Sequence, residues 1–319
     1  MTPSINQDIQ RQAILSNFKD WLKSPDLDFP YSDHTIRAYL RHARRFLEFV
    51  ADIHVEHLEE VNKAAVRGYL KENAQGLSSS TRTQIIASIE SFFDFASTNA
   101  LCETNPARGF RAENARRKRG GRAEKKLAPF LYPSETEQLI GSIFSGTAKN
   151  RERNLAIVGL MLDSGVRTSE LSQLKVRDIQ SMLTNRRLQV VGKGGKERII
   201  VPLQNFSDHT QRYLDLRMEQ GASPGDYFFV TRNNLPIKQP TVHYILKKHL
   251  NKLHISKSQF GGHLLRHTSG TMMLSEGMNM RRVQDNLGHA NINTTQIYTH
   301  LVDSWEGGSM AKPFTGISK

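Results

Sequence analysis

The chain has 319 residues, of which 38% are hydrophobic, and its 44 lysines and arginines outnumber its 31 acidic residues, which gives a net charge of +13. This length exceeds one ordinary core, so we expect two domains, and the hydrophobic content argues against global disorder. A chain this basic is typical of proteins that bind nucleic acid; a merely solvated basic surface is the alternative. The single cysteine, Cys102, excludes a disulfide framework and a cysteine-based zinc site.

The sequence predicts neither a secretory signal nor a membrane span. Its first residues, MTPSINQDIQRQ, are polar, and no run of 18 apolar residues occurs. One cysteine also favours a reducing compartment. We therefore expect a cytoplasmic protein, with no membrane partner, that works beside chromosomal or plasmid DNA.

Residues 1–105 are expected to form a helical domain, with about thirty residues before the first clear helix. Ser32 or Asp33 can cap a helix over HTIRAYLRHARRFLEFV, whose apolar residues recur at three-and-four spacing. NKAAVRGYLKEN and SSSTRTQIIASIESFFDFASTNA predict two further helices. The candidates for contacts with DNA in this domain are Arg37, Arg41, Arg44 and Arg82.

Residues 106–130 are expected to be a basic interdomain linker, because no apolar period runs through PARGFRAENARRKRGGRAEKKLA. Its basic run would lie along DNA phosphates. A nuclear-localisation signal in RRKR is the alternative. The candidate DNA-binding residues here are Arg116, Arg117, Lys118 and Arg119.

Residues 131–319 are expected to form the second domain. YPSETEQLIGSIF and RNLAIVGLMLDSG predict helices, the second ending at Gly165. RLQVVGKGGKERIIVPL is the clearest strand signal, with two apolar arms around a glycine-rich turn. The whole chain therefore reads as mainly α with a small β-sheet.

Arg167 follows the helix that ends at Gly165, and Glu170 lies three residues further on. This carboxylate could bond the backbone or hold the Arg167 side chain, and an ordinary capping box is the alternative. In the hairpin, VGKGGKER lacks the spacing of a Walker phosphate loop, so we expect no nucleotide binding there. Lys193 in the turn could reach a phosphate or a leaving oxygen; a solvated turn is the alternative.

His263 and Arg266 are three residues apart in GGHLLRHTSGTMMLSEG, so they share one face of a helix. His267 is four residues from His263, and two metal ligands are conceivable there. No nearby Glu or Cys completes such a site, so we predict no metal and no cofactor.

His289 and Tyr298 lie in LGHANINTTQIYTH, a stretch too polar for a core. A surface tyrosine is the alternative to a functional one. Taken with the arginines and Lys193, however, these residues match one chemistry. Guanidinium groups bind phosphate oxygens, histidine moves protons near neutral pH, and a phenol can be a covalent nucleophile. The set predicts phosphoryl transfer on a phosphodiester without a metal.

The motifs GVRTSEL, GKGGKER, HLLRHT and LGHANINTTQIYTH resemble the signature boxes of the tyrosine recombinases, also called the phage-integrase family. Their order and gaps also match, from about residue 10 to the end. One departure is SG after LRHT, where the family often has Phe-Ala. The resemblance implies a two-domain DNA clamp, with an N-terminal core-binding domain and a C-terminal catalytic domain.

By this resemblance, the Tyr298 hydroxyl attacks the scissile phosphate and forms a 3′-phosphotyrosyl link. Lys193 would be the general acid for the departing 5′-oxygen, and His263 would help accept the Tyr298 proton. Strand exchange then passes through a Holliday junction, and no ATP is needed.

The resemblance assigns Arg167 and Arg266 to the non-bridging phosphate oxygens and His289 to a hydrogen bond with the phosphate. Glu170 would orient these neighbours. The implied partners are double-stranded recombination sites, further copies of the chain in a tetramer on two sites, and an accessory DNA-bending or directionality protein. The C-terminal tail would contact a neighbouring subunit.

Two other functions compete with active recombination. One is an inactive DNA-binding accessory protein with the same fold. The intact set of six catalytic candidates argues against it: Arg167, Lys193, His263, Arg266, His289 and Tyr298. The other is a type IB topoisomerase-like enzyme, which the length and the separate helical domain disfavour. Among recombinases, the chain leaves too few residues for an arm-binding domain and no room for the inserted helix of integron integrases. A Xer-like or mobile-element recombinase fits best.

Overall fold

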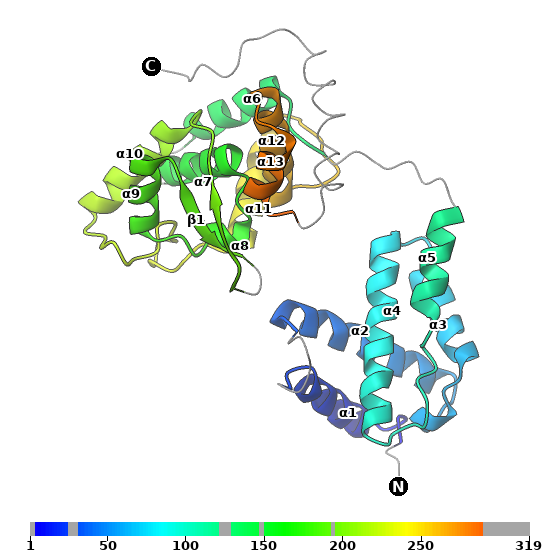
Figure 1. Cartoon of the computed structure of the whole chain (residues 1–319). Helices are drawn as coiled ribbons and strands as arrows, with labels where there is room; N and C mark the ends of the chain where they lie inside the picture. Colours follow the sequence, from blue (N-terminus) through cyan, green and yellow to red (C-terminus); the bar gives the residue numbers. More distant parts are fainter. Residues whose placement is uncertain (1–3, 25–30, 121–128, 147–149, 193–194, 290–319) are drawn as a thin grey trace. The chain divides into compact units, whose positions relative to one another are not determined.

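The computed structural model describes residues 4–24, 31–120, 129–146, 150–192 and 195–289, with the backbone alone for residues 116–120 (Figure 1). The chain divides into two units, Met1–Lys125 and Lys126–Lys319. As the sequence predicts, the described part is mainly helical with a two-stranded sheet. None of the described helices is long and apolar enough to cross a membrane.

The first unit is helical. Its elements are α1 (Asp8–Trp21), α2 (Asp33–Asp52), η1 (Leu58–Glu60), α3 (Lys63–Ala74), α4 (Ser79–Thr98) and α5 (Phe110–Gly120). The expected start of α2 is confirmed, because the Ser32 hydroxyl accepts a hydrogen bond from the Thr35 N–H. The apolar stripe of α2 packs on α4, where the rings of Phe46 and Phe93 meet edge to face at 5.5 Å. Cys102 is buried beside this core.

Two helices of this unit lie where the sequence indicated none. Helix α1 occupies part of the stretch expected to precede the first clear helix, and it buries Ile14, Leu15 and Phe18. Helix α5 occupies residues 110–120 of the basic stretch 106–130, in which the sequence showed no apolar period and indicated no helix. Buried Phe110 and polar bonds to α4 hold α5 in place: Arg111 Nε lies 2.7 Å from Glu90, and Asn114 donates to Thr83 at 3.0 Å. An apolar-period search does not detect a helix anchored in this way.

The second unit surrounds a buried helix, α7. Its elements are α6 (Pro133–Phe144), α7 (Arg151–Ser164), α8 (Thr168–Leu171), α9 (Val176–Asn185), β1 (Leu188–Val191), β2 (Glu197–Ile200), α10 (Ser207–Glu219), α11 (Gln239–Lys252), α12 (Gly262–Ser275) and α13 (Met280–Leu287). Helix α7 packs against α6, α10 and α12, and its residues from Leu155 to Ser164 are all buried.

The predicted hairpin is confirmed as an antiparallel pair of β1 and β2, in which Val190 lies opposite Arg198. Leu188, Val190 and Ile200 are buried, whereas Val191 and Ile199 point to solvent. Because side chains alternate along a strand, Arg198 lies on the inward face together with Ile200. Strand β2 packs against α13, and this contact brings the hairpin to the segment that carries His289.

Candidate active site

Five of the seven residues predicted for the catalytic site come together in the second unit. Arg167 directly precedes α8, Glu170 lies within it, and His263 and Arg266 lie on α12. His289 follows Gly288, which ends α13 in the left-handed conformation. The other two, Lys193 and Tyr298, lie outside the described residues, so their positions stay predictions.

Arg266 connects the ends of two helices. Its side chain is buried, and it donates to the carbonyl of Gly165 at 2.6 Å and to the carbonyl of Leu287. These carbonyls belong to the C-terminal ends of α7 and α13, where backbone acceptors lack intrahelical partners and a cation is favoured. Arg266 therefore fixes the two short segments that carry Arg167 and His289.

The approach of these two helix ends requires a glycine at position 165. Gly165 has φ of +61°, a conformation that side chains other than glycine rarely adopt. A Cβ atom there would also collide with the Leu287 side chain. The glycine thus ends α7 and lets α13 pack directly on that end.

Arg167 is held at three points and still reaches solvent. Its backbone N–H donates to Glu170 Oε2 at 2.8 Å, and its Nη1 donates to Glu170 Oε1 at 2.9 Å. Its Nη2 donates to the carbonyl of Gly288 at 3.0 Å. Both roles considered for Glu170 in the sequence, bonding the backbone and holding Arg167, are therefore present. The Arg167 side chain remains 37% exposed, which leaves its guanidinium accessible to a ligand.

Arg198 is a site residue that the sequence analysis missed. Its Nη1 and Nη2 donate to Glu170 Oε1 and Oε2 at 2.5 and 2.8 Å, and its Nε donates to the carbonyl of Asn286 at 3.0 Å. Burial alone would raise the pKa of Glu170, but hydrogen bonds from Arg198 and Arg167 outweigh it and lower that pKa. A signal was present in the sequence: strand alternation places Arg198 on the same face as buried Ile200, and an inward-facing arginine requires a partner.

The histidines of the site lie in a cationic environment. Burial, followed by the charges of Arg266 and Arg167, lowers the pKa of His263 and lowers that of His289 to about 4. Burial lowers the pKa of His267 to about 4 as well. These imidazoles are therefore neutral at neutral pH, and each can donate one N–H and accept one proton. The described residues contain no group of three or more His, Cys, Asp or Glu that could hold a metal ion.

Three predicted DNA-binding residues share one surface of the first unit. Arg37, Arg41 and Arg44 are exposed on α2 and line a groove with residues of α1, among them Lys19 and Gln12. Arg37 also donates to the backbone carbonyl of Asp33 at 3.2 Å. This groove presents four cationic side chains to a common space, as a phosphate-binding surface requires.

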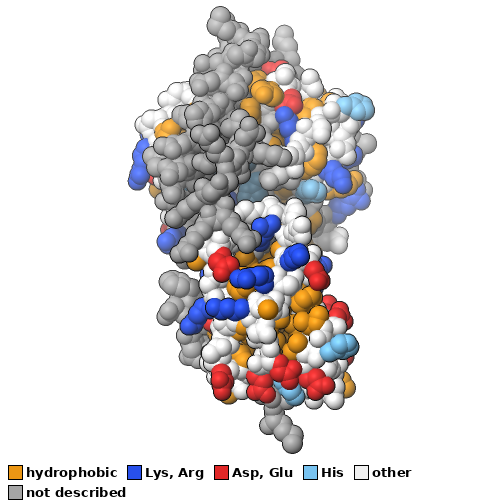
Figure 2. Space-filling view, turned by 90° about the vertical axis from the view of Figure 1, so that its right-hand side faces the viewer, with side chains coloured by type: hydrophobic (Ala, Val, Ile, Leu, Met, Phe, Trp, Pro, Cys, Tyr) orange, Lys and Arg blue, Asp and Glu red, His pale blue; other side chains and the backbone are white. Residues whose placement is uncertain are grey.

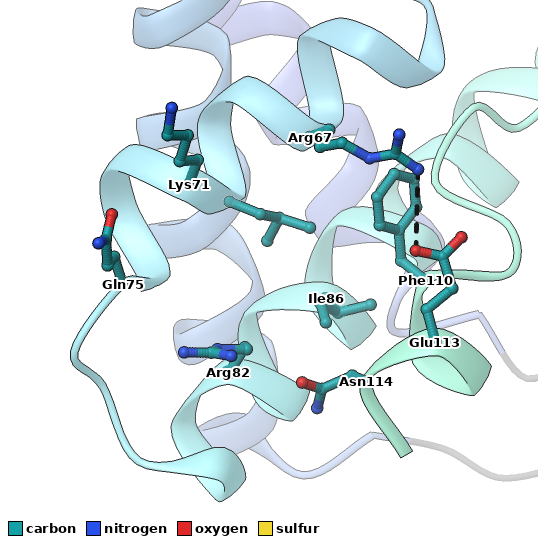
Figure 3. A pocket seen from close by; sticks show the side chains of 9 residues that line it. Arg67, Lys71, Gln75, Arg82, Ile86, Phe110, Glu113 and Asn114 are labelled. Carbon is teal, nitrogen blue, oxygen red and sulfur yellow. Dashed lines mark ion pairs between the residues drawn. The ribbon is translucent and has the colours of Figure 1, made fainter. Parts of the chain in front are cut away.

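Arg82 lies in a different pocket, bounded by α3, α4 and α5 (Figure 3). Its guanidinium donates to the carbonyl of Ala74 at 3.2 Å, and Arg67 across the pocket pairs with Glu113 at 3.8 Å. Figure 2 shows basic and apolar side chains next to one another on the visible face of this unit, with acidic ones gathered at its lower end. The side chains of Arg116, Arg117, Lys118 and Arg119 lie outside the description.

Comparisons with known proteins match both units. Residues 129–304 match the phage integrase family, and residues 18–99 match the N-terminal SAM-like domain of phage integrases. The chain is 32% identical over 295 residues to a tyrosine recombinase of Pseudothermotoga lettingae, which covers 92% of this chain and 95% of that protein. It is 33% identical over 303 residues to tyrosine recombinase XerC of Halalkalibacterium halodurans, covering 92% and 94%.

Solved structures share the fold at lower identity. The XerH site-specific recombinase bound to palindromic difH substrate gives a TM-score of 0.71 at 18% identity and covers 95% of each chain. A lambda integrase dimer bound to a core site gives a TM-score of 0.65 at 15% identity, covering 94% of this chain and 98% of that one. The two-unit helical fold and these matches define a site-specific DNA recombinase. The chain belongs to the phage integrase family, whose members are the tyrosine recombinases.

Proposed function

We propose that this recombinase cuts and rejoins DNA with Tyr298 as its nucleophile and with Arg167, Lys193, His263, Arg266 and His289 as its catalytic residues. One observation carries the proposal. Arg167 and Arg266 bond to the carbonyls of Gly288 and Leu287, the two residues directly before His289. Two guanidinium groups and an imidazole thus converge where α13 ends, a set suited to one phosphate.

In the cleavage step, Tyr298 Oη bonds to phosphorus and the bond from phosphorus to the 5′-oxygen breaks. His263 accepts the tyrosine proton, and Lys193 gives a proton to the leaving oxygen. Arg167 and Arg266 stabilise the charge that builds on the non-bridging oxygens, a contribution of about 3 kcal/mol for each donor. The freed 5′-hydroxyl of a partner strand reverses the step, so the energy of the phosphodiester bond is retained.

The proposed partners are two double-stranded recombination sites and four copies of the chain assembled on them, with an accessory DNA-bending or directionality protein as a further partner. The arginine-lined groove between α1 and α2 would hold phosphates of the DNA arm. The Xer-type relative supports a Xer-like role over one in a mobile element. We place this reaction in the cytoplasm.

Covalent trapping tests the proposal. The protein is incubated with sheared genomic DNA of its source, detergent is added, and protein-bound fragments are sequenced. Tyr298→Phe is run in parallel, because it lacks the hydroxyl that would attack. With the native chain, we expect to recover DNA fragments that all contain one common site. With Tyr298→Phe, we expect to recover no fragments.

Two outcomes would contradict the proposal. Tight DNA binding without covalent DNA from either protein would indicate an inactive accessory protein. Relaxation of a plasmid that carries a single site, without any need for paired sites, would indicate a topoisomerase-like enzyme.

A further inference from the structure

Three charged side chains form a continuous chain from the hairpin to the solvent-exposed edge of the candidate active site. Glu170 lies in the middle, with its side chain only 2% exposed. Each of its oxygens accepts two hydrogen bonds, one from Arg167 and one from Arg198. Two positive charges share one negative charge, so the three side chains together retain a single positive charge.

Arg198 and Arg167 use their charges in different directions. All three guanidinium nitrogens of Arg198 donate inward, two to Glu170 and one to the carbonyl of Asn286, and its side chain is 14% exposed. Arg167 is 37% exposed and donates one Nη to the segment before His289. Of these two cations, Arg167 is therefore the one placed to meet a phosphate.

The position of Arg198 is fixed on several sides. Strand β2 places it opposite buried Val190, and the carbonyl of Asn286 holds its Nε. Gly288, with φ of +60°, leaves the room that its side chain occupies, because a Cβ at position 288 would lie 3.0 Å from Arg198 Cδ and Nε. The Arg198 side chain is thus packed against α13 and is held in one position.

Removing Arg198 would change the charge that Arg167 offers. The buried carboxylate of Glu170 would then have Arg167 as its remaining guanidinium partner, and the two charges would cancel. A carboxylate within hydrogen-bond distance of a guanidinium weakens its attraction for a phosphate, and this effect is large where solvent is partly excluded.

We propose that Arg198 is a positioning residue that neutralises Glu170, so that Arg167 keeps its orientation and a net positive charge for the scissile phosphate. Arg198 itself does not touch the DNA. This inference rests on the proposed function, since it gives Arg167 a role at the phosphate.

The test uses DNA that carries one site identified by covalent trapping. Two quantities are measured with it: the rate of covalent complex formation at saturating DNA, and the dissociation constant of the protein for this DNA. We expect Arg198→Met to lower the rate roughly 10- to 100-fold, less than the ~10²- to 10³-fold expected for a lost direct donor, as in Arg167→Ala. The dissociation constant should stay within about twofold, because most binding energy comes from other phosphates. Arg198→Lys keeps the charge and should retain more activity than Arg198→Met.

The decisive variant is Arg198→Met combined with Glu170→Gln. A neutral amide at position 170 does not compete for the Arg167 charge, so the double variant should be faster than Arg198→Met alone and close to Glu170→Gln alone. This comparison also holds if Arg198→Met fails to fold, because the double variant buries no unpaired charge. Arg177→Met, which removes an exposed arginine on α9, is the matched control and should behave as the native chain.

Each result has one meaning. A native rate for Arg198→Met would overturn the inference. A double variant much slower than Glu170→Gln alone would also overturn it, because Arg198 would then act by packing and not through its charge. Failure of the native chain to form any covalent complex, or a native rate for Arg167→Ala, would overturn the proposed function instead.

Discussion

The side-chain amide of Asn286 pairs with the main chain of Val201 in both directions. The Val201 N–H donates to Asn286 Oδ1 at 3.0 Å, and Asn286 Nδ2 donates to the Val201 carbonyl at 2.9 Å. Asn286 is 2% exposed, so water does not substitute for either bond. This pairing connects the end of β2 to α13 and so fixes the hairpin to the segment that carries His289.

Asn286→Asp should destabilise the second unit. Aspartate can still accept from the Val201 N–H, but its other oxygen would face the Val201 carbonyl without a proton between them. An unsatisfied buried pair of this kind costs about 2–3 kcal/mol. Urea unfolding followed by circular dichroism measures the change, and Asn185→Asp at the exposed end of α9 is the control. An unchanged unfolding midpoint for Asn286→Asp would show that the pairing contributes nothing.

The stability of the second unit should depend on the protonation of Asp163. Burial raises the pKa of this carboxyl to about 7, against the effect of hydrogen bonds from the N–H groups of Phe206 and Asn205, which lower it. Because the folded pKa lies above the unfolded value near 4, the contribution is complete below about pH 4 and is lost as pH rises through 7. The loss amounts to about 4 kcal/mol over that window.

Asp163→Asn removes this titration, so the free energy of unfolding of the native chain minus that of the variant should fall as pH rises from 5 to 8. His267 and His289 have lowered pKa values, so they stabilise the fold above their unfolded pKa and lose that contribution as pH falls toward 4. Their effect on the free energy of unfolding is the same in both proteins and cancels in the difference. A difference that is constant with pH would contradict the prediction.

DNA binding should be accompanied by proton uptake at His289. The charges of Arg266 and Arg167 add to burial in lowering its pKa to about 4, and a phosphate bound among them would offset the cationic part. The pKa then rises, so protons should be taken up between about pH 4 and 7, with little uptake at pH 8. Calorimetric titration in buffers of different ionisation enthalpy measures the number of protons. Uptake should fall in His289→Asn but not in His254→Asn, an exposed histidine of the same unit; equal uptake in both variants would rule out His289 as the acceptor.

The groove between α1 and α2 should contribute to the salt dependence of DNA binding. The logarithm of the association constant should fall linearly with the logarithm of salt concentration, steeply for this basic chain. Changing Arg37, Arg41 and Arg44 to Gln should reduce the slope by about 2–3, since each released phosphate contact contributes about 0.9. Arg177→Gln in the other unit is the control. A flat salt response of the native chain, or an unchanged slope in the triple variant, would contradict a phosphate-binding groove.

Sequence patterns predicted the elements whose cores are apolar and periodic. Helix α2, the buried helix α7 and the hairpin follow from spacing, caps and turn residues. The three-residue separation of Arg167 and Glu170 allowed their side-chain pair as one alternative beside an ordinary capping box. The same patterns did not predict α5, because it is anchored by one buried side chain, Phe110, and by polar bonds from Arg111 and Asn114 to α4. Such partners are distant in sequence and become apparent once the helices are placed.

The sequence motifs indicated individual residues of the candidate site. They did not indicate the hydrogen bonds that connect these residues. Arg198 stands in the GKGGKER motif, yet its partner Glu170 precedes it by 28 positions on another element. The bonds of Arg266 to two helix ends likewise depend on the packing of α12 against α7 and α13. Sequence motifs identify the functional side chains, whereas the packing of the helices determines which charged side chains pair with one another.

The burial of Cys102 has a practical consequence for spectroscopy. Burial raises the pKa of this thiol, and the sequence holds no other cysteine. The thiolate that reacts with maleimide dyes is therefore scarce and poorly accessible at neutral pH. A cysteine introduced at an exposed position in each unit would be labelled ahead of it, so a pair of fluorophores would show whether the distance between the labelled positions changes when DNA is added.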